Sequence, residues 1–78
     1  MRRVRVVPSA LRELVDNLEA SPTQVDDIVR RAREIASGRS GSRVPFSHPP
    51  AMYYDVGRIR MVYQQREHEM VILQFIRL

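Results

Sequence analysis

Cysteine and lysine are both absent from this 78-residue chain, and glycine occurs only three times. Without cysteine the chain forms neither disulfide bonds nor thiolate metal sites, which fits a reducing compartment. No apolar run approaches the ~20 residues that a membrane helix needs. The N-terminal valines are interrupted by Arg5 and ended by Pro8, unlike a signal peptide. We therefore expect a soluble, cytoplasmic protein that does not enter a membrane.

Motifs that would hold a cofactor are missing as well. The sequence contains no metal-ligand spacing, no phosphate-binding glycine loop and no nucleophile–base motif. It therefore predicts no metal site and no cofactor.

All thirteen side chains in the lysine and arginine class are arginines, and the net charge is +4. A GC-rich genome would favour arginine codons, which explains the choice without any function. Arginine also grips phosphate bidentately, where lysine acts as a point charge. Both explanations can hold together. The net positive charge fits a nucleic acid or an acidic protein as the partner, and it does not distinguish between them.

The length of the chain is enough for one domain and too small for two. A chain of this size buries only about 60% of the surface that its unfolded form exposes. We expect a single domain over residues 1–78 with a thin core.

The first part of the chain changes from a strand pattern to a helix pattern. Val4 and Val6 alternate with arginines over residues 2–7, as in a half-buried strand, and Pro8 ends the alternation. From Ala10 onward, apolar residues recur at helical spacing in one stripe: Leu11, Leu14, Val15 and Leu18. We expect a short amphipathic helix with this stripe buried.

A second helix has signals at both ends. Ser21 is placed to cap the first turn, Pro22 suits the first helical position, and Gln24 can complete a capping box. Gly38 is the natural terminator. The expected buried stripe is Val25, Ile28, Val29, Ala32, Ile35 and Ala36. The chain therefore begins with a strand followed by a helical hairpin.

Residues 37–50 are rich in serine, glycine and proline and show no usable period. We expect a loop there. Because connections in compact domains usually have ~4–6 residues, a loop of this length is either mobile or functional. It carries Arg39, Arg43 and His48.

The sequence from residue 51 onward predicts three antiparallel strands, over residues 51–55, 58–64 and 70–76. A turn at Val56 and Gly57 would join the first two. The predicted fold class is therefore α+β, in the order β-α-α-β-β-β, with the antiparallel sheet packed on the N-terminal helical hairpin.

The register of the last hairpin follows if one face of the sheet must be apolar. A three-residue loop over residues 66–68 gives such a face: Ile59, Met61 and Tyr63 opposite Phe75, Leu73 and Val71. The other face then mixes basic and apolar side chains: Arg58, Arg60, Val62 and Gln64 opposite Ile76, Gln74, Ile72 and Met70. Since such a mixture is unusual in water, we expect a contact surface there.

This order of elements resembles the RelE/ParE superfamily of toxin–antitoxin toxins, and three segments carry the likeness. Residues 6–14 (VVPSALREL) look like that superfamily's strand-to-helix opening. Residues 53–63 (YYDVGRIRMVY) resemble its central hairpin, in which a glycine turn precedes an arginine and a hydrophobic-hydrophobic-Tyr run. Residues 71–77 (VILQFIR) are similar to its last core strand, which typically ends in a basic residue.

The resemblance implies a RelE-like toxin, a ribosome-dependent mRNA endoribonuclease that an antitoxin neutralises. Cleavage of RNA by its 2′-hydroxyl needs a base, an acid and a group that stabilises the extra charge on phosphorus. Arg60 matches the superfamily's phosphate-stabilising arginine, and Arg77 matches the basic residue at the end of the last strand. His48 or Tyr54 would supply the acid–base chemistry.

RNA binding would fall to other arginines. The candidates are Arg58, Arg43 and Arg39, of which the last two lie on the long loop. His68 is a poor candidate for the reaction, because it lies at the far hairpin tip, roughly 26 Å from Arg60 along the strand.

These residues also have purely structural interpretations. Tyr63 shares a face with Ile59 and Met61 and is expected in the core. Arg60 could be a solvated arginine of the sheet, and His48 an ordinary loop histidine.

Two other functions stay open at this point. A ParE-like protein would act without catalysis, by binding another protein such as DNA gyrase. An orphan or phage-borne relative would use the fold as a module that binds protein or nucleic acid. The expected partners are therefore an antitoxin, together with either the ribosome and its mRNA or a host protein.

Overall fold

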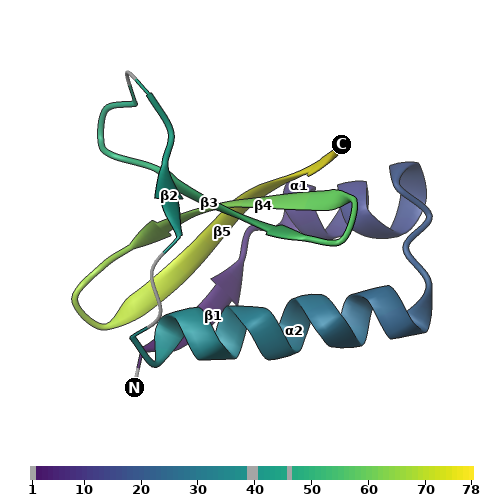
Figure 1. The fold of residues 1–78 in the computed structure, drawn as a ribbon, viewed down its shortest axis with the longest axis horizontal. Coiled ribbons are helices and arrows are strands. Elements are labelled where there is room, and N and C mark those ends of the chain that lie inside the picture. Colours follow the sequence, from purple (N-terminus) through teal and green to yellow (C-terminus); the bar gives the residue numbers. More distant parts are fainter. Residues whose placement is uncertain (1, 39–40, 46) are drawn as a thin grey trace.

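The computed structural model describes residues 2–38, 41–45 and 47–78, and it confirms the predicted α+β class. The strands form one sheet in the order β1-β5-β4-β3-β2, in which β1 runs parallel to β5 and the other neighbours are antiparallel. Figure 1 shows the sheet with its helices. The elements are β1 (Arg3–Val6), α1 (Pro8–Arg12), η1 (Glu13–Asn17), α2 (Pro22–Ala36), β2 (Ser42–Arg43), β3 (Met52–Val56), β4 (Ile59–Gln65) and β5 (Glu69–Arg77).

The first helical segment begins earlier and winds more loosely than its pattern predicts. α1 starts at Pro8, and η1 is a π-helix in which the Leu18 amide donates to the Glu13 carbonyl at 2.9 Å. The wider turn buries side chains that are four residues apart: Ala10, Leu14 and Leu18. Leu11 and Val15, which belonged to the predicted buried stripe, are 51% and 57% exposed.

α2 begins and ends as predicted. The Ser21 hydroxyl accepts a hydrogen bond from the Gln24 amide at 3.2 Å, and the Gln24 side chain accepts one from the Ser21 amide at 2.8 Å. The helix ends at Ala36, and Gly38 follows with a φ of 128° that favours glycine. None of the described helices is long and apolar enough to cross a membrane.

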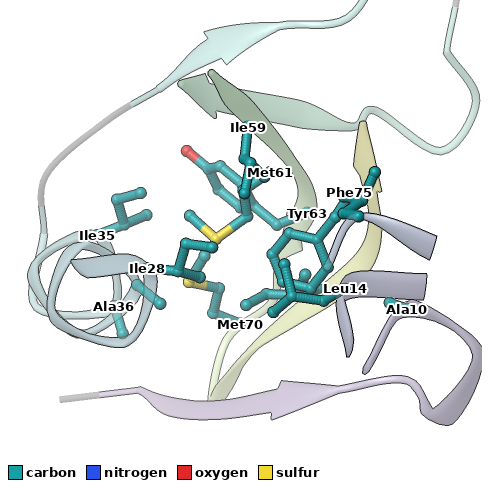
Figure 2. Packing of buried hydrophobic residues seen from close by; sticks show 13 residues of the cluster. Ala10, Leu14, Ile28, Ile35, Ala36, Ile59, Met61, Tyr63, Met70 and Phe75 are labelled. Carbon is teal, nitrogen blue, oxygen red and sulfur yellow. The ribbon is translucent and has the colours of Figure 1, made fainter. Parts of the chain in front are cut away.

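The core lies between the helices and one face of the sheet (Figure 2), which we call the helix face. Tyr63 is fully buried there, as the structural interpretation expected. The helices and Leu18, which directly follows η1, face this core; the helical residues are Ala10, Leu14, Ile28, Ala32, Ile35 and Ala36. The sheet contributes Ile59, Met61, Tyr63, Met70, Ile72 and Phe75. The opposite face of the sheet is called the outer face below.

The last hairpin turns more tightly than predicted. The Arg66 amide donates to the Glu69 carbonyl at 2.8 Å, which leaves residues 67–68 as the tip. Residues 66–68 do connect β4 to β5, as predicted, but this hydrogen bond shifts the pairing of the two strands by one residue.

The predicted register of β4 on β5 is wrong. Tyr63 lies opposite Ile72, and beyond an irregularity in the ladder Met61 lies opposite Phe75. This β-bulge admits an extra residue of β5, so that strand changes which face its side chains occupy. Met70 and Ile72, which were expected on the outer face, lie between the tip and the bulge, so the shift at the tip places them in the core, and beyond the bulge Phe75 faces the core again.

Two residues of β5 leave the predicted apolar face for the same reason. Val71 lies opposite Gln64, and Leu73 is the residue that the bulge leaves outside the register. Val71 is still buried, although it lies outside the core cluster between helices and sheet.

The segment predicted as a loop contains a short edge strand. β2 pairs antiparallel with Tyr53 and Met52. Next to it, a Cβ on Gly41 would lie 2.4 Å from both the Tyr53 carbonyl oxygen and the Tyr63 hydroxyl. Only glycine fits here without a shift of the surrounding backbone.

Candidate functional site

Arg60, the predicted phosphate-stabilising residue, is engaged by two neighbours on the outer face. Its Nε and Nη2 donate to the two carboxylate oxygens of Asp55, at 2.7 and 3.1 Å. Its Cζ lies 4.1 Å from the centroid of the Tyr53 ring, a cation–π contact. The bulge also places Arg60 opposite Ile76, where the predicted register had Gln74. Both an edge and a face of the guanidinium are thus occupied.

The pairing of Arg60 with Asp55 sets the charge at this position. Hydrogen bonds from Arg60 hold the pKa of Asp55 below its ordinary value, and the same hydrogen bonds raise the pKa of Arg60. Both side chains are about one-third exposed, at 37% for Asp55 and 34% for Arg60. Asp55 therefore stays ionised at neutral pH and neutralises the guanidinium. A phosphate would have to displace it.

Arg77 lies on the helix face of the sheet. It pairs across the ladder with the buried Ile59, and its Nη2 donates to the carbonyl of Leu18 at the end of η1. Carbonyls at a helix end lack partners within the helix, so Arg77 caps η1. Since Arg60 projects from the outer face, the two predicted catalytic arginines lie on opposite faces and do not form one site.

The predicted acid–base residues do not complete the set. Tyr54 lies opposite Met61 and packs against the core on the helix face. His48 is exposed on the connection from β2 to β3, which projects from the body of the sheet in Figure 1. Burial raises the pKa of the Tyr63 hydroxyl, which disfavours its ionised form.

The two predicted RNA-binding arginines that the structure describes lie near opposite ends of β3. Arg58 is exposed at the turn that follows this strand, whereas Arg43 is exposed on β2 opposite Met52, where β3 begins. The two ends of β3 are about 14 Å apart. Arg39 lies outside the described residues. Within the described part of the chain, no cluster of three His, Asp or Glu side chains could hold a metal ion.

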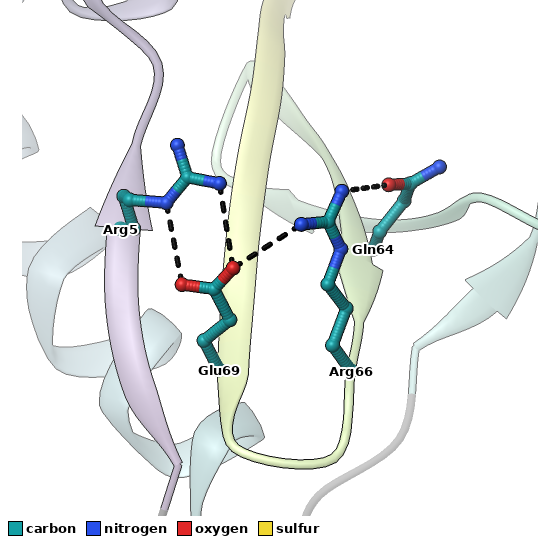
Figure 3. A network of polar contacts seen from close by, with 4 residues as sticks. All are labelled: Arg5, Gln64, Arg66 and Glu69. Atoms are coloured by element: carbon teal, nitrogen blue, oxygen red, sulfur yellow. Dashed lines mark hydrogen bonds and ion pairs between the residues drawn. The ribbon is translucent and has the colours of Figure 1, made fainter.

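A second ion-pair network lies on the outer face, near the tip of the last hairpin (Figure 3). Glu69 accepts hydrogen bonds from Arg5 at 3.3 Å and from Arg66 at 3.2 Å, and Arg66 also donates to Gln64 at 3.2 Å. Arg5 is the main cause of the lowered pKa of Glu69. The network links β1, β5 and β4 and neutralises part of the positive charge of the outer face.

An apolar groove of about 410 Å³ opens between β1, α1, η1 and α2. This volume falls in the range of known ligand sites. Three arginines also line the groove, and of these Arg3 and Arg33 are exposed. The apolar lining consists of Val4, Val6, Leu11, Leu14, Val25, Ile28, Val29, Ala32, Ala36, Ile72 and Phe75. The third arginine is Arg2.

The sequence analysis missed this groove, although it identified most of the residues that line it. Leu11 and Val29 were assigned to buried stripes, yet they are 51% and 42% exposed. The sequence feature that could have indicated the groove is the width of the apolar stripes on the helices. Two helices on one face of a small sheet leave part of each stripe uncovered. Exposed apolar side chains that gather beside one another mark a surface for binding.

Similarity to known proteins does not indicate a function for this chain. No protein-family model, no curated protein and no solved structure matches the chain.

Proposed function

We propose that the chain is a RelE/ParE-like protein that acts in the cytoplasm as a non-catalytic protein-binding module. Its partners are an antitoxin and a host protein, of which DNA gyrase is one example, as the resemblance implies. The observation that carries the proposal is the separation of Arg60 from Arg77. They lie on opposite faces, and Asp55 and the Leu18 carbonyl already engage them.

The groove supports binding to a protein. It combines a long apolar lining with half-exposed side chains such as Leu11 and Val29. Burial of such side chains against a partner contributes roughly 25 cal/mol for each Å² of apolar surface removed from water. The order of one strand, two helical segments and an antiparallel meander supports the RelE/ParE resemblance.

The ribosome-dependent endoribonuclease is the second candidate. It is favoured by one observation, the contact of Arg60 with the ring of Tyr53 on the outer face. An arginine beside an aromatic ring can stack an unpaired RNA base and contact its phosphate. This function would require Asp55 to release Arg60 when RNA binds.

Expression in bacteria separates the two functions. We expect the wild type and Arg60→Ala to affect growth equally while translated mRNA stays intact. Leu11→Asp should lose the effect, because it places a charge in the groove that the partner would cover. Growth curves and primer extension on translated mRNA are the measurements.

Leu78→Asp is the matched control, since Leu78 is 52% exposed, close to the 51% of Leu11, and lies outside the lining of the groove. It should behave as wild type. Cleavage of translated mRNA that disappears in Arg60→Ala would overturn the proposal in favour of the endoribonuclease.

A further inference from the structure

We propose that a segment of the partner protein binds as an added strand along the edge of β1, and that acidic and apolar residues alternate in this segment. The inference rests on the proposed function, because it states how the protein-binding module holds its partner. It follows from the backbone of β1, the directions of its side chains and the charges beside it.

The edge of β1 has backbone groups available for another strand. β1 is the terminal strand of the sheet, and within the described residues it pairs with β5 alone. The Arg3 and Val7 amides donate to carbonyls of the β5 side at 3.1 and 3.0 Å. Since alternate residues bond to a parallel neighbour, the amides and carbonyls of Val4 and Val6 point toward the other edge, where the preceding amide of that row, on Arg2, already donates to the Ala36 carbonyl at 3.3 Å. Such a row of groups can accept a further strand.

The side chains of β1 would give the two sides of an added strand different surroundings. Val4 and Val6 line the apolar groove, whereas Arg3 and Arg5 alternate with them and are exposed, and Arg3 also borders the groove. Successive side chains of a strand also point to opposite faces. Every second residue of the added strand would therefore cover the groove, where apolar side chains are favoured. The residues between them would lie beside the arginines.

The positive charge of the β1 arginines favours acidic residues on the outer side of the added strand. Arg5 is already bound to Glu69, so Arg3 offers its charge most freely to a cross-strand partner. Opposite charges across neighbouring strands stabilise the pair, and like charges destabilise it. Arg33, which is exposed where α2 lines the groove, adds positive charge on the other side.

A second copy of this chain is a poor occupant for the same edge. Two β1 strands paired edge to edge would bring Arg3 and Arg5 of one copy beside those of the other. Charged residues on an edge strand oppose this kind of self-association. The basic edge thus favours a different protein over a homodimer.

Model peptides test the proposal with the full chain. The probe is a fluorescent eight-residue peptide of alternating Glu and Val, used at a concentration at which it is monomeric. One control peptide has Lys in place of Glu, and another has the same composition as the probe with four Glu followed by four Val. Fluorescence anisotropy should show binding of the probe that is at least about tenfold tighter than that of either control.

Variants of β1 test whether the peptide binds at the edge of this strand. Arg3→Glu should weaken the Glu–Val peptide roughly tenfold and strengthen the Lys–Val peptide. Arg58→Glu makes the same change of charge at the β3–β4 turn, on the other side of the sheet, and should change neither. Val4→Pro removes one donor from the edge and should abolish binding, while circular dichroism shows that the fold is kept.

Equal binding of the alternating and the block peptide would overturn the proposal, and so would unchanged binding in Arg3→Glu. A dimer of the wild type that Val4→Pro dissociates would also overturn it in favour of self-association. The same variants distinguish a failure of strand addition from a failure of the proposed function. If a native partner is lost with Leu11→Asp but retained by Arg3→Glu and Val4→Pro, strand addition is wrong and protein binding stands.

Discussion

At the residue scale, the pair of Arg60 and Asp55 decides what the outer face can bind. Because Arg60 lowers the pKa of Asp55, the folded state binds the carboxylate proton less readily than the unfolded chain does. The pair therefore contributes stability above the unfolded pKa. That contribution is lost as the pH falls through the lower, folded pKa.

We expect Asp55→Asn to be less stable than the wild type at pH 7. The difference should shrink below about pH 4 and vanish once the wild-type carboxylate is protonated. Urea unfolding at a series of pH values measures it. The exposed Asp16 provides an Asp16→Asn control. A loss in Asp55→Asn that is the same at pH 7 and pH 2 would contradict the ion pair as its cause.

Gly41 is the second residue on which a local structure depends. A methyl group there would lie 2.4 Å from the Tyr53 carbonyl oxygen and the Tyr63 hydroxyl. We expect Gly41→Ala to lower the free energy of unfolding by about 1–3 kcal/mol, because a well-packed site has to shift. In Ser42→Ala, at an exposed neighbouring position, the change should stay within about 0.5 kcal/mol. Equal stability of the two variants in urea would disprove this close contact.

At the scale of elements, Arg77 joins the end of β5 to the end of η1. Arg77 is exposed, and its guanidinium donates to the carbonyl of the buried Leu18. A hydrogen bond from a charged group to such a carbonyl contributes about 1.5–3 kcal/mol. Arg77 therefore caps η1 in the folded chain, and its catalytic role stays a prediction.

We expect Arg77→Ala to reduce stability by about 1–2 kcal/mol, which thermal or urea unfolding measures. Arg58→Ala removes an arginine from an exposed turn and should change stability by less than about 0.5 kcal/mol. The reverse order of the two variants would show that the cap on η1 contributes little.

Elements defined by local interactions could be predicted from the sequence. The capping box of Ser21 and Gln24 involves neighbours in the chain, so the start of α2 was correct. The register of β4 on β5 depends on a tight hairpin tip and on a bulge next to Tyr63. A bulge is set by how both faces of a strand pack in three dimensions, which periodicity alone does not encode.

At the scale of the whole molecule, the candidate site could be predicted only in part. The sequence indicated a mixed outer face, and Arg60 does lie there. It did not indicate that Asp55 would neutralise Arg60, because the cross-strand pairing of these residues follows from the register of β3 on β4. The groove escaped prediction because its lining comes from β1, the helices and β5, which are distant in sequence.

The central claim is that this chain acts by binding a protein through the groove beside β1. Quantitative affinity capture, followed by mass spectrometry and RNA sequencing of the bound material, tests it with four proteins: wild type, Leu11→Asp, Leu78→Asp and Arg60→Ala. The account predicts one protein partner that the wild type, Leu78→Asp and Arg60→Ala retain and Leu11→Asp loses. RNA that Leu11→Asp still captures and Arg60→Ala loses would contradict it.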